Sequence, residues 1–340
     1  MEKKFNVGVI GAGRMGKIHI QNILRNIPDF KLKLVADINI DDQMEEWANK
    51  IGVPLLTKDP NDILDDPEID AIIIASSTNT HVKLIQEAAR VKKDVFCEKP
   101  IDTDLKRIRE TLEIVKKEGI KLMIGFNRRF DRNFKRIREI VSTGQIGIPQ
   151  IIKVTARDPV LPPIEYIKES GGMFFDMTIH DWDMVSFQAG SEVEEIYATG
   201  AVLIDPEVGK VGDIDTVAVI LKLKNGALGL IDNSRQAVYG YDQRVEVFGS
   251  KGCVIADNEP SNTVRLYTAE KTKEDNIPYF FLERFMDAYS AELQSFLECL
   301  CNNKEPSPGG KDGLQNALVA IAAQKSYEEN RPVKISEIDT

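Results

Sequence analysis

The stretch of sequence that decides the fold lies at the start of the chain and reads Phe5-Asn-Val-Gly-Val-Ile-Gly-Ala-Gly-Arg-Met-Gly16. An apolar run, a G-x-G-x-x-G turn and then a helical pattern to about Asn26 are typical of a dinucleotide-binding βαβ unit. Gly11 allows the tight turn, Gly13 lets the backbone approach a pyrophosphate, and Gly16 lets helix and strand pack closely. The N-terminus of the helix would attract the phosphates. We therefore expect this stretch to begin a Rossmann-type domain.

The same alternation of apolar runs and helical stretches continues beyond this turn. Residues 71–75 form an uninterrupted Ala-Ile-Ile-Ile-Ala run, which is typical of a strand buried on both faces. Further strands are predicted at 6–10, 32–36, 94–97 and 121–125, and helices at 13–26, 41–51 and 80–90. We expect a doubly wound parallel sheet in an N-terminal domain over residues 1–125.

After about Gly147 the pattern changes to longer β segments, several of them alternating. We predict strands at 150–157, 194–204, 214–224, 226–234, 244–249 and 252–256, with Lys224-Asn-Gly226 as a hairpin turn. Helices are predicted at 173–188, 282–301 and 312–328. Residues 126–340 should therefore form an α+β domain with a large, mostly antiparallel open sheet.

Composition narrows the class of protein. The chain has 340 residues, 42% of them hydrophobic, and 44 Lys+Arg against 54 Asp+Glu give a net charge of −10. An acidic protein repels nucleic acid and anionic membranes, so we expect neither as a partner. No apolar run approaches the roughly 18–20 residues needed to span a bilayer, and no signal peptide is evident, so we expect a cytoplasmic protein.

The four cysteines give no pattern of a metal or disulfide site. Cys97, Cys253, Cys299 and Cys301 lack C-x-x-C spacing, and the last two would point to nearly opposite sides of a helix. We expect no structural metal and no disulfide framework.

Asp37 ends the second predicted strand, where an acid would hydrogen-bond the adenosine ribose diol of a dinucleotide. Its carboxylate would repel a 2′-phosphate, which favours NAD over NADP, although Arg14 could soften that preference. A glycine-rich turn followed by a turn aspartate is the purely structural alternative. His81 follows the polar loop Ser76-Ser-Thr-Asn79-Thr and either caps the next helix or touches the cofactor, whereas His19 is expected to be a packing residue.

Two further motifs carry titratable groups. Glu98-Lys99-Pro100 places Lys99 at the carboxyl end of a predicted parallel strand, where ligands of open α/β sheets bind. By position alone, a surface lysine before a turn is the favoured reading of Lys99. Residues 171–183 read Gly-Gly-Met-Phe-Phe-Asp-Met-Thr-Ile-His-Asp-Trp-Asp, with Asp176 and His180 at i and i+4 and Asp183 three residues further, on one face of a predicted helix.

This pattern is suited to alcohol oxidation. A histidine of unperturbed pKa about 6.5 can take a hydroxyl proton near neutrality, and a carboxylate one turn away can orient it and stabilise its cation. The structural alternative is a capped helix with a structural histidine. Tyr267-Thr-Ala-Glu-Lys271 matches the Tyr-x-x-x-Lys spacing of short-chain dehydrogenases, but it lies in a polar stretch far from the dinucleotide half and is interpreted as coincidence.

These motifs together resemble the glucose-fructose oxidoreductase, inositol dehydrogenase and rhizopine catabolism family over nearly the whole chain. The segments that carry the resemblance are Gly8-Val-Ile-Gly-Ala-Gly13, Glu98-Lys99-Pro100, Gly125-Phe-Asn-Arg-Arg-Phe-Asp131, residues 172–183, Tyr239-Gly-Tyr-Asp242 and Arg284-Phe-Met-Asp-Ala-Tyr289.

The resemblance implies an NAD-dependent dehydrogenase in which Lys99, Asp176 and His180 form the catalytic group. His180 would be the base, Asp176 its partner, and Lys99 would orient the reacting hydroxyl. The residues expected to bind the cofactor are Gly11, Gly13, Arg14, Met15, Gly16, Asp37, Ser76, Asn79, His81, Glu98 and Lys99. Those expected to bind a small polyol are Lys99, Arg128, Asp158, Asp176, His180, Asp183, Tyr241 and Tyr289. The family commonly assembles through the open face of the second sheet, so we expect a homotetramer.

One departure bears on the substrate. Where the inositol enzymes tend to have His-Arg-Asn-Pro, this chain has Ala156-Arg-Asp-Pro159. A missing buried partner can cost about 1–3 kcal/mol. Despite this departure, the first expectation is oxidation of a ring secondary alcohol of a cyclitol, with myo-inositol giving its 2-keto product. Dehydrogenation of another cyclitol or a sugar with NAD or NADP is the alternative within the same chemistry, and a dinucleotide-sensing regulatory protein without turnover is the alternative from another class.

Overall fold

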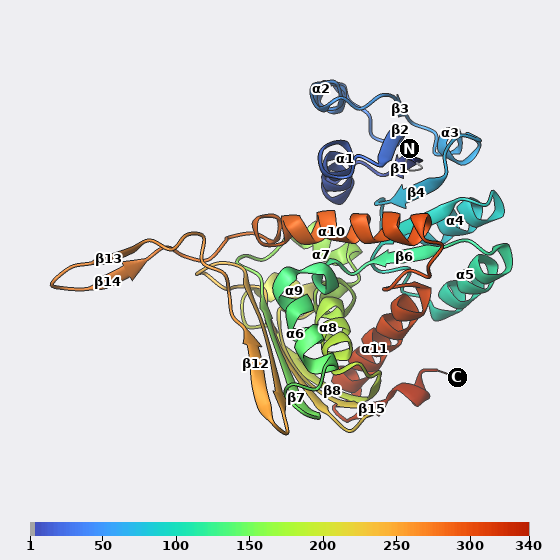
Figure 1. Ribbon diagram of the computed structural model, residues 1–340. Helices are drawn as coiled ribbons and strands as arrows, with labels where there is room; N and C mark the ends of the chain where they lie inside the picture. Colours follow the sequence, from blue (N-terminus) through green and yellow to red (C-terminus); the bar gives the residue numbers. More distant parts are fainter. Residues whose placement is uncertain (1–3, 340) are drawn as a thin grey trace. The chain divides into compact units, whose positions relative to one another are not determined.

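The computed structural model describes residues 4–339, and the chain divides into two compact units (Figure 1). Among the described residues, the first unit consists of residues 4–127 and 287–315, and the second of residues 128–286 and 316–339. The predicted boundary at residue 125 lies close to the division after Asn127. Residues 287–315, which the sequence analysis placed in the second domain, cluster with the first unit instead.

The first unit is built on a six-stranded parallel sheet of order β3-β2-β1-β4-β5-β6. Its strands are β1 (Phe5–Ile10), β2 (Phe30–Ala36), β3 (Leu56–Thr57), β4 (Ala71–Ile74), β5 (Asp94–Glu98) and β6 (Leu122–Gly125). β4 is buried at every position, as a strand covered on both faces should be. The order reverses between β1 and β4, and the crevice at such a switch point is where ligands of doubly wound sheets bind. The parallel sheet is confirmed, while the two-residue β3 was not predicted because it is too short to show a period.

The helices of this unit connect its strands. They are α1 (Arg14–Asn26), α2 (Asp42–Ile51), α3 (Asn61–Leu64), α4 (Thr78–Arg90) and α5 (Leu105–Glu118). Asp41 caps α2 by accepting from the Met44 N–H at 2.8 Å, and Asp104 caps α5 in the same way through the Lys106 N–H. The helices predicted from residues 13, 41 and 80 begin within about two residues of the observed starts of α1, α2 and α4.

Residues 287–315 join the first unit through aromatic packing and a backbone bridge. The helix α10 (Phe281–Cys301) carries Phe296, whose ring lies 6.2 Å from that of Phe30 and 6.1 Å from that of Phe96. Gly309 forms an antiparallel bridge with Met123. These contacts join residues distant in sequence, and for that reason the local pattern did not show them.

The second unit contains a seven-stranded sheet of order β12-β11-β7-β10-β9-β8-β15, in which only the β7–β10 pair is parallel. Its strands are β7 (Pro149–Arg157), β8 (Val193–Ala201), β9 (Thr216–Leu223), β10 (Leu228–Ser234), β11 (Asp242–Gly249), β12 (Gly252–Ala256) and β15 (Val333–Lys334). The predicted turn joins β9 to β10, and Gly226 adopts a φ of +88° there. The mostly antiparallel sheet is confirmed.

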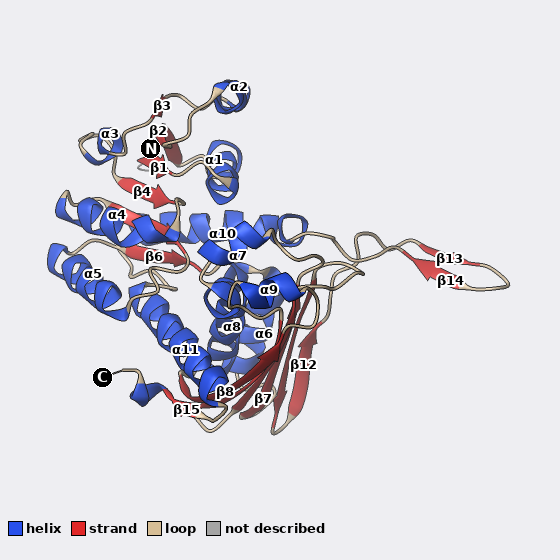
Figure 2. Cartoon of the chain, turned by 180° about the vertical axis from the view of Figure 1, so that it is seen from behind, coloured by secondary structure: helices blue, strands red, loops and turns tan. Residues whose placement is uncertain are grey.

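The helical segments of the second unit begin and end as follows: α6 (Arg132–Ser142), α7 (Ile164–Glu169), η2 (Met173–Thr178), α8 (Ile179–Ala189), α9 (Pro206–Lys210) and, from residue 316 on, α11 (Gly310–Glu329), with the short 3₁₀ turns η1 (Asn127–Phe130) and η3 (Ile335–Glu337). α6 and α8 cover one face of the sheet, as Figure 2 shows. The other face presents partly exposed apolar side chains, namely Ile220, Leu228, Leu230, Phe248 and Ile255.

The segment that holds Tyr267 and Lys271 is a two-stranded hairpin of β13 (Arg265–Tyr267) and β14 (Thr272–Glu274), where the sequence analysis expected a polar connection (Figure 1). Tyr267 is 70% exposed at the end of β13. Within residues 4–339, no helix combines the length and the apolar character that crossing a membrane requires.

Candidate active site

The glycine turn after β1 has the shape that its sequence predicts. Gly11 adopts a φ of +94°, and a Cβ on it would lie 2.5 Å from the backbone nitrogen of Ser76. A Cβ on Gly16 would lie 1.9 Å from the carbonyl oxygen of Gly11, so both positions are closed to any side chain. At Gly13, in contrast, a Cβ would meet nothing within 4 Å. The turn therefore leaves open space at Gly13, in front of the N-terminus of α1, where a pyrophosphate would fit.

Asp37 lies directly after β2, beside this turn. Its Oδ2 accepts from the Ala12 N–H at 2.6 Å and its Oδ1 from the Asn39 N–H at 2.8 Å. Each carboxylate oxygen has more than one lone pair, so both can still accept from a ribose hydroxyl. The chain thus fixes an acid next to the open space at Gly13, and the two features fit an NAD molecule.

His81 joins two loops at the carboxyl edge of the sheet. Its Nδ1 lies 2.8 Å from the carbonyl oxygen of Pro100, and its Nε2 lies 3.0 Å from that of Ser76. Burial lowers the pKa of His81, and a neutral ring donates to only one of these oxygens. His81 therefore links the end of β4 to the Lys99-Pro100 turn. Asn79 is exposed and is the second residue of α4, and Ser76 lies just before the helix.

Glu98 ends β5, and its carboxylate points into the interior of the first unit. Its Oε1 lies 2.7 Å from Nε2 of buried His19, so His19 does more than fill space. Glu292 is buried nearby, and burial together with Glu98 raises its pKa well above the usual value, which favours the protonated acid. The ring of Tyr289 meets His19 edge to face at 6.2 Å. Lys99 follows Glu98 at the strand end and is half-buried.

The sequence predicts Asp176 and His180 on one regular α-helix. In the structure of the second unit they do not share one. Residues 173–178 form a π-helical turn, in which the Thr178 hydroxyl donates to the carbonyl oxygen of Met173 at 3.2 Å, and α8 begins only at Ile179. A π-turn spaces its hydrogen bonds at i→i+5, which shifts the positions of side chains that a 3.6-residue period would align. Such turns are frequent at functional sites, and the sequence period does not reveal them.

Asp176 is held by contacts outside its own helical segment. The Tyr166 hydroxyl donates to its Oδ1 at 2.9 Å, and the guanidinium of Arg235 lies 3.4 Å from its Oδ2. The imidazole of His180, in the first turn of α8, is half-buried. An oriented carboxylate thus lies one turn before a partly accessible imidazole.

Asp183 was expected on the same stripe, but its partners are different. Arg129 donates to both of its carboxylate oxygens, at 2.6 and 2.9 Å, and the Asn316 amide donates to Oδ1 at 2.7 Å. The prediction of one regular helical stripe is therefore wrong for Asp176, which lies in the π-turn, whereas His180 and Asp183 both lie on α8.

The sequence analysis missed Asp181, which is completely buried beside His180 in the chain. It forms an ion pair with Arg128 and accepts from the Asn233 amide at 2.9 Å. Burial alone would lower the pKa of Arg128, but Asp181 and then Tyr241 raise it above its usual range. The second Nη of Arg128 lies 3.4 Å from the hydroxyl of Tyr241, whose pKa burial raises to about 12. Arg128 and Tyr241, both predicted, are thus brought together.

Asp158 follows β7 and lies in the same electrostatic environment. Burial raises its pKa to about 6; the positive charge of Arg235 opposes this rise, and the negative charge of Asp176 adds to it. Arg235, whose side chain is 1% exposed, was also missed, since nothing in a single arginine after a strand marks it. Of the predicted polyol set, the second unit contains Arg128, Asp158, Asp176, His180, Asp183 and Tyr241, and Lys99 and Tyr289 belong to the first.

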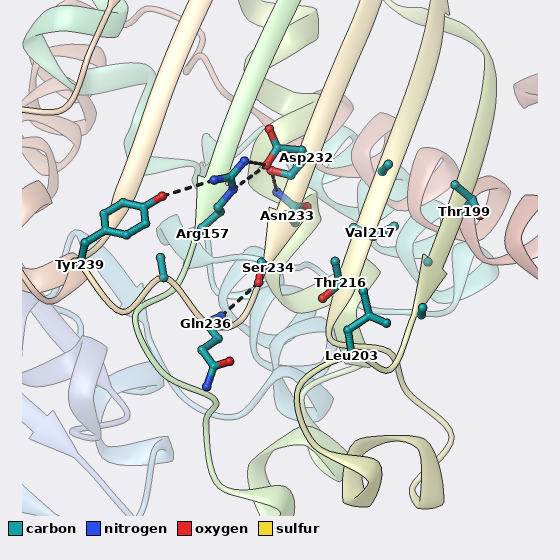
Figure 3. Close-up of a pocket in the computed structure, with 14 residues that line it drawn as sticks. Arg157, Thr199, Leu203, Thr216, Val217, Asp232, Asn233, Ser234, Gln236 and Tyr239 are labelled. Carbon is teal, nitrogen blue, oxygen red and sulfur yellow. Dashed lines mark hydrogen bonds and ion pairs between the residues drawn. The ribbon is translucent and has the colours of Figure 1, made fainter.

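A cavity of about 540 Å³ lies on the open face of the second sheet and is not lined by the predicted residues. Figure 3 shows Arg157 there, donating to Asp232 at 2.7 Å and approaching the Tyr239 hydroxyl at 3.3 Å. Arg157 precedes Asp158 directly, and successive strand residues point to opposite faces. The cavity is therefore a feature of the exposed face and does not contain the acids described above.

Comparison with known families identifies the two halves of the chain. Residues 5–126 match the model of an oxidoreductase family described as an NAD-binding Rossmann fold, and residues 138–335 match the C-terminal alpha/beta domain of the same family. The chain belongs to the glucose-fructose oxidoreductase, inositol dehydrogenase and rhizopine catabolism family. It is an oxidoreductase whose cofactor is NAD.

Individual relatives cover the whole chain. It is 48% identical to a protein named myo-inositol 2-dehydrogenase from Thermotoga maritima, over 98% of this chain and 99% of the relative. It is 43% identical to an inositol 2-dehydrogenase from Rhizobium meliloti, over 97% of this chain and 98% of the relative. A crystal structure of scyllo-inositol dehydrogenase from Lactobacillus casei, with bound NAD(H) and scyllo-inositol, superposes with a TM-score of 0.90 at 31% identity, over 98% of this chain and all of the other.

Within this family, the position of Asp37 leads to a prediction about cofactor choice. Asp37→Ser should weaken NAD binding about tenfold and improve NADP binding. The carboxylate's hydrogen bonds are charge-assisted and worth about 1.5–3 kcal/mol each, and its repulsion of a 2′-phosphate disappears with it. Titrating both cofactors against intrinsic fluorescence measures the change. A wild-type protein that binds NADP as tightly as NAD would contradict the role of Asp37.

The raised pKa of Asp158 leads to a prediction about stability. A carboxyl that titrates at about 6 in the folded chain and near 3.8 when unfolded favours the folded state below pH 4, and this contribution is lost as the pH rises through 6. Asp158→Asn removes the ionisation, so it should raise Tm at pH 8 relative to wild type and have a smaller or opposite effect at pH 4. Thermal unfolding of both proteins at the two pH values tests this expectation. Equal shifts at both values would contradict it.

Proposed function

We propose that the protein oxidises a ring secondary alcohol of a cyclitol with NAD, and that myo-inositol, converted to its 2-keto product, is the first substrate to consider. The observation that carries the proposal is the partly accessible His180 one turn after Asp176, a carboxylate that Tyr166 and Arg235 hold in place. The names of the relatives from Thermotoga maritima and Rhizobium meliloti point to the same substrate. Since the reaction draws on a pool of NAD, we place it in the cytoplasm.

In the proposed mechanism, His180 takes the proton of the reacting hydroxyl. Asp176 orients the imidazole and stabilises the imidazolium that forms, because a carboxylate interacts more favourably with the charged ring than with the neutral one. Lys99, at the carboxyl end of β5, donates a hydrogen bond that orients the same hydroxyl. Bound NAD supplies the acceptor for the hydride that leaves the carbinol carbon. Transfer of the hydroxyl proton to His180 raises the electron density on the substrate oxygen, and this favours departure of the hydride.

We further propose roles for the remaining predicted residues. Arg128, Tyr241 and Tyr289 would contact the hydroxyls of a polyol as donors, and Asp158 as an acceptor. Asp183 would contribute only the lone pairs that Arg129 and Asn316 leave open. Around the cofactor, the glycine turn with Arg14 and Met15 would hold the pyrophosphate, and Asp37 the adenosine ribose. Ser76, Asn79, His81, Glu98 and Lys99 would form the side nearer the nicotinamide.

Asp158 bears on how the site would hold a cyclitol, and a related structure suggests a second candidate substrate. A carboxylate accepts hydrogen bonds only, whereas an amide also donates, so the site selects hydroxyls that point their protons toward Asp158. A stereoisomer such as scyllo-inositol, the ligand named for the Lactobacillus casei structure, presents its hydroxyls differently and is the second candidate.

A screen of cyclitols and sugars with NAD or NADP, followed by absorbance of the reduced nicotinamide, tests the proposal. We expect turnover with NAD and with myo-inositol or scyllo-inositol above all sugars. NAD binding without turnover on any polyol would favour the regulatory alternative, and faster turnover on a sugar would reassign the substrate.

For assembly, we propose that the open face of the second sheet joins copies of this chain into a homotetramer. Ile220, Leu230 and Phe248 lie on this face at 49%, 37% and 45% exposure, and contiguous apolar surface of this kind marks interaction sites. Light scattering should give about four times the monomer mass, and Ile220→Glu with Leu230→Glu should lower the mass. A stable wild-type monomer at micromolar concentration would contradict this assembly.

A further inference from the structure

Arg235, which approaches Asp176, is a cation with a buried side chain. It follows the last residue of β10, and its backbone N–H donates to the carbonyl oxygen of Asp215 at 3.0 Å. Its side chain is only 1% exposed. Burying a guanidinium is costly unless acids and hydrogen bonds compensate, so the residues that face it define its role.

The contacts of Arg235 are looser than those of a structural ion pair. Its Nη1 and Nη2 lie 3.5 and 3.4 Å from Oδ2 of Asp176, whereas charge-assisted pairs normally close to about 2.7–2.9 Å. Its Nε is buried and meets no acceptor among the described residues. By comparison, Arg129 approaches Asp183 to 2.6 Å. The guanidinium therefore keeps donor capacity that Asp176 does not use.

Asp158 is fastened to the same loop. Its backbone N–H donates to the carbonyl oxygen of Ser234 at 2.9 Å, and the Ala237 N–H donates to its carbonyl oxygen at 2.7 Å. Arg235 thus lies between the two residues that bond the backbone of Asp158. The parallel register of β10 and β7, which pairs Ser234 with Arg157, produces this arrangement.

The charges around Asp158 come from several elements. Besides Arg235, they are Asp176 on η2, Arg128 on η1, Asp181 on α8 and the Tyr241 phenol before β11. Arg128 already has Asp181 as its ion-pair partner. Arg235, in contrast, approaches Asp176 directly, and its charge also lowers the pKa of Asp158.

We propose that Arg235 is a positioning residue of the polyol site, which holds Asp158 and Asp176 as a pair of oriented carboxylates. This inference rests on the proposed function, since it assigns these two acids to the substrate and to the base. With Arg235 present, Asp158 accepts a substrate hydroxyl and Asp176 orients His180. Without it, two adjacent acids lose their shared counter-charge, and one of them is protonated near neutrality.

The test compares Arg235→Gln, Arg235→Lys, Asp158→Asn and the double variant Asp158→Asn/Arg235→Gln, each as the full chain with NAD and the best cyclitol. Arg235→Gln should move the acidic limb of the kcat/KM profile up by one pH unit or more and raise KM for the cyclitol at least tenfold. The Kd for NAD should stay within twofold. The double variant should have an acidic limb within half a unit of wild type, because Asp176 then loses the repulsion of Asp158 together with the charge of Arg235.

Arg138→Gln is the matched control, since this half-buried arginine of α6 contacts the carbonyl oxygen of Gln188 and the ring of Phe187 but none of these acids. It should leave the pH profile and KM unchanged. An Arg235→Gln protein with the wild-type limb and KM, or a double variant no closer to wild type than Arg235→Gln, would overturn the inference.

If Arg235→Gln does not fold, Arg235→Lys decides the question. Lysine keeps the charge but lacks the two Nη groups that approach Asp176, so KM should rise at least threefold. An unchanged KM with Arg235→Lys would overturn the inference. The proposed function fails by a different result, namely wild-type turnover after His180→Ala, or no turnover of any cyclitol by the wild type.

Discussion

His180→Ala should lower kcat on the best cyclitol by about 10²–10⁴, which is the range expected for loss of a general base. The Kd for NAD should barely change, because the loss falls on proton transfer and not on contacts with the cofactor. Asp176→Asn should also slow turnover and shift the pH profile, since an amide cannot stabilise the imidazolium as a carboxylate does. Steady-state rates with saturating NAD, measured between pH 6 and pH 10, give both effects.

Lys99→Ala should be severe as well, and its loss should not add to that of His180→Ala if the two residues act as a unit. His19→Gln offers a comparison, because His19 is a buried histidine engaged with Glu98. Its effect should fall mainly on stability. A His180→Ala protein that keeps near wild-type kcat at neutral pH would make Lys99 the better candidate for the proton acceptor.

Gly13→Val should raise the Kd for NAD by about 100-fold or more while the protein remains folded. The backbone of Gly13 has φ −67° and ψ −161°, which any residue can adopt, and a Cβ there meets no atom within 4 Å. A valine would instead fill the space in which a pyrophosphate approaches the N-terminus of α1. Losing two charge-assisted hydrogen bonds of about 1.5 kcal/mol each accounts for a change of this size.

Two other glycines serve as comparisons for Gly13→Val. Gly16→Ala should destabilise the first unit, because its Cβ would lie 1.9 Å from the carbonyl oxygen of Gly11. Gly252→Val lies in β12, where a Cβ has only ordinary contact at 3.8 Å, and should alter neither stability nor NAD affinity appreciably. Isothermal titration with NAD and thermal unfolding distinguish the three proteins. Unchanged NAD affinity in Gly13→Val would place the cofactor's phosphates elsewhere.

Local sequence determined the two kinds of sheet and the part of the site that would hold the cofactor. The apolar run of β4 and the glycines after β1 act through neighbouring residues, since burial of a strand and the conformation of a turn are short-range properties. The turn at Gly226 and the position of Asp37 after β2 could be predicted for the same reason. The family resemblance of the motifs around Lys99 and His180 predicted the catalytic roles of these residues, which the local pattern alone left open.

Tertiary structure alone decided which groups surround the proposed catalytic acids. The π-turn at residues 173–178 separates Asp176 from Asp183, although a 3.6-residue period aligns them. Asp181, and not Asp183, binds Arg128. Asp158 lies beside the loop that carries Arg235 because β10 pairs in parallel with β7, and this register joins residues more than 70 positions apart in the sequence. Pairings of this kind depend on the packing of whole strands, so periodicity and spacing in the sequence do not show which buried charges will meet.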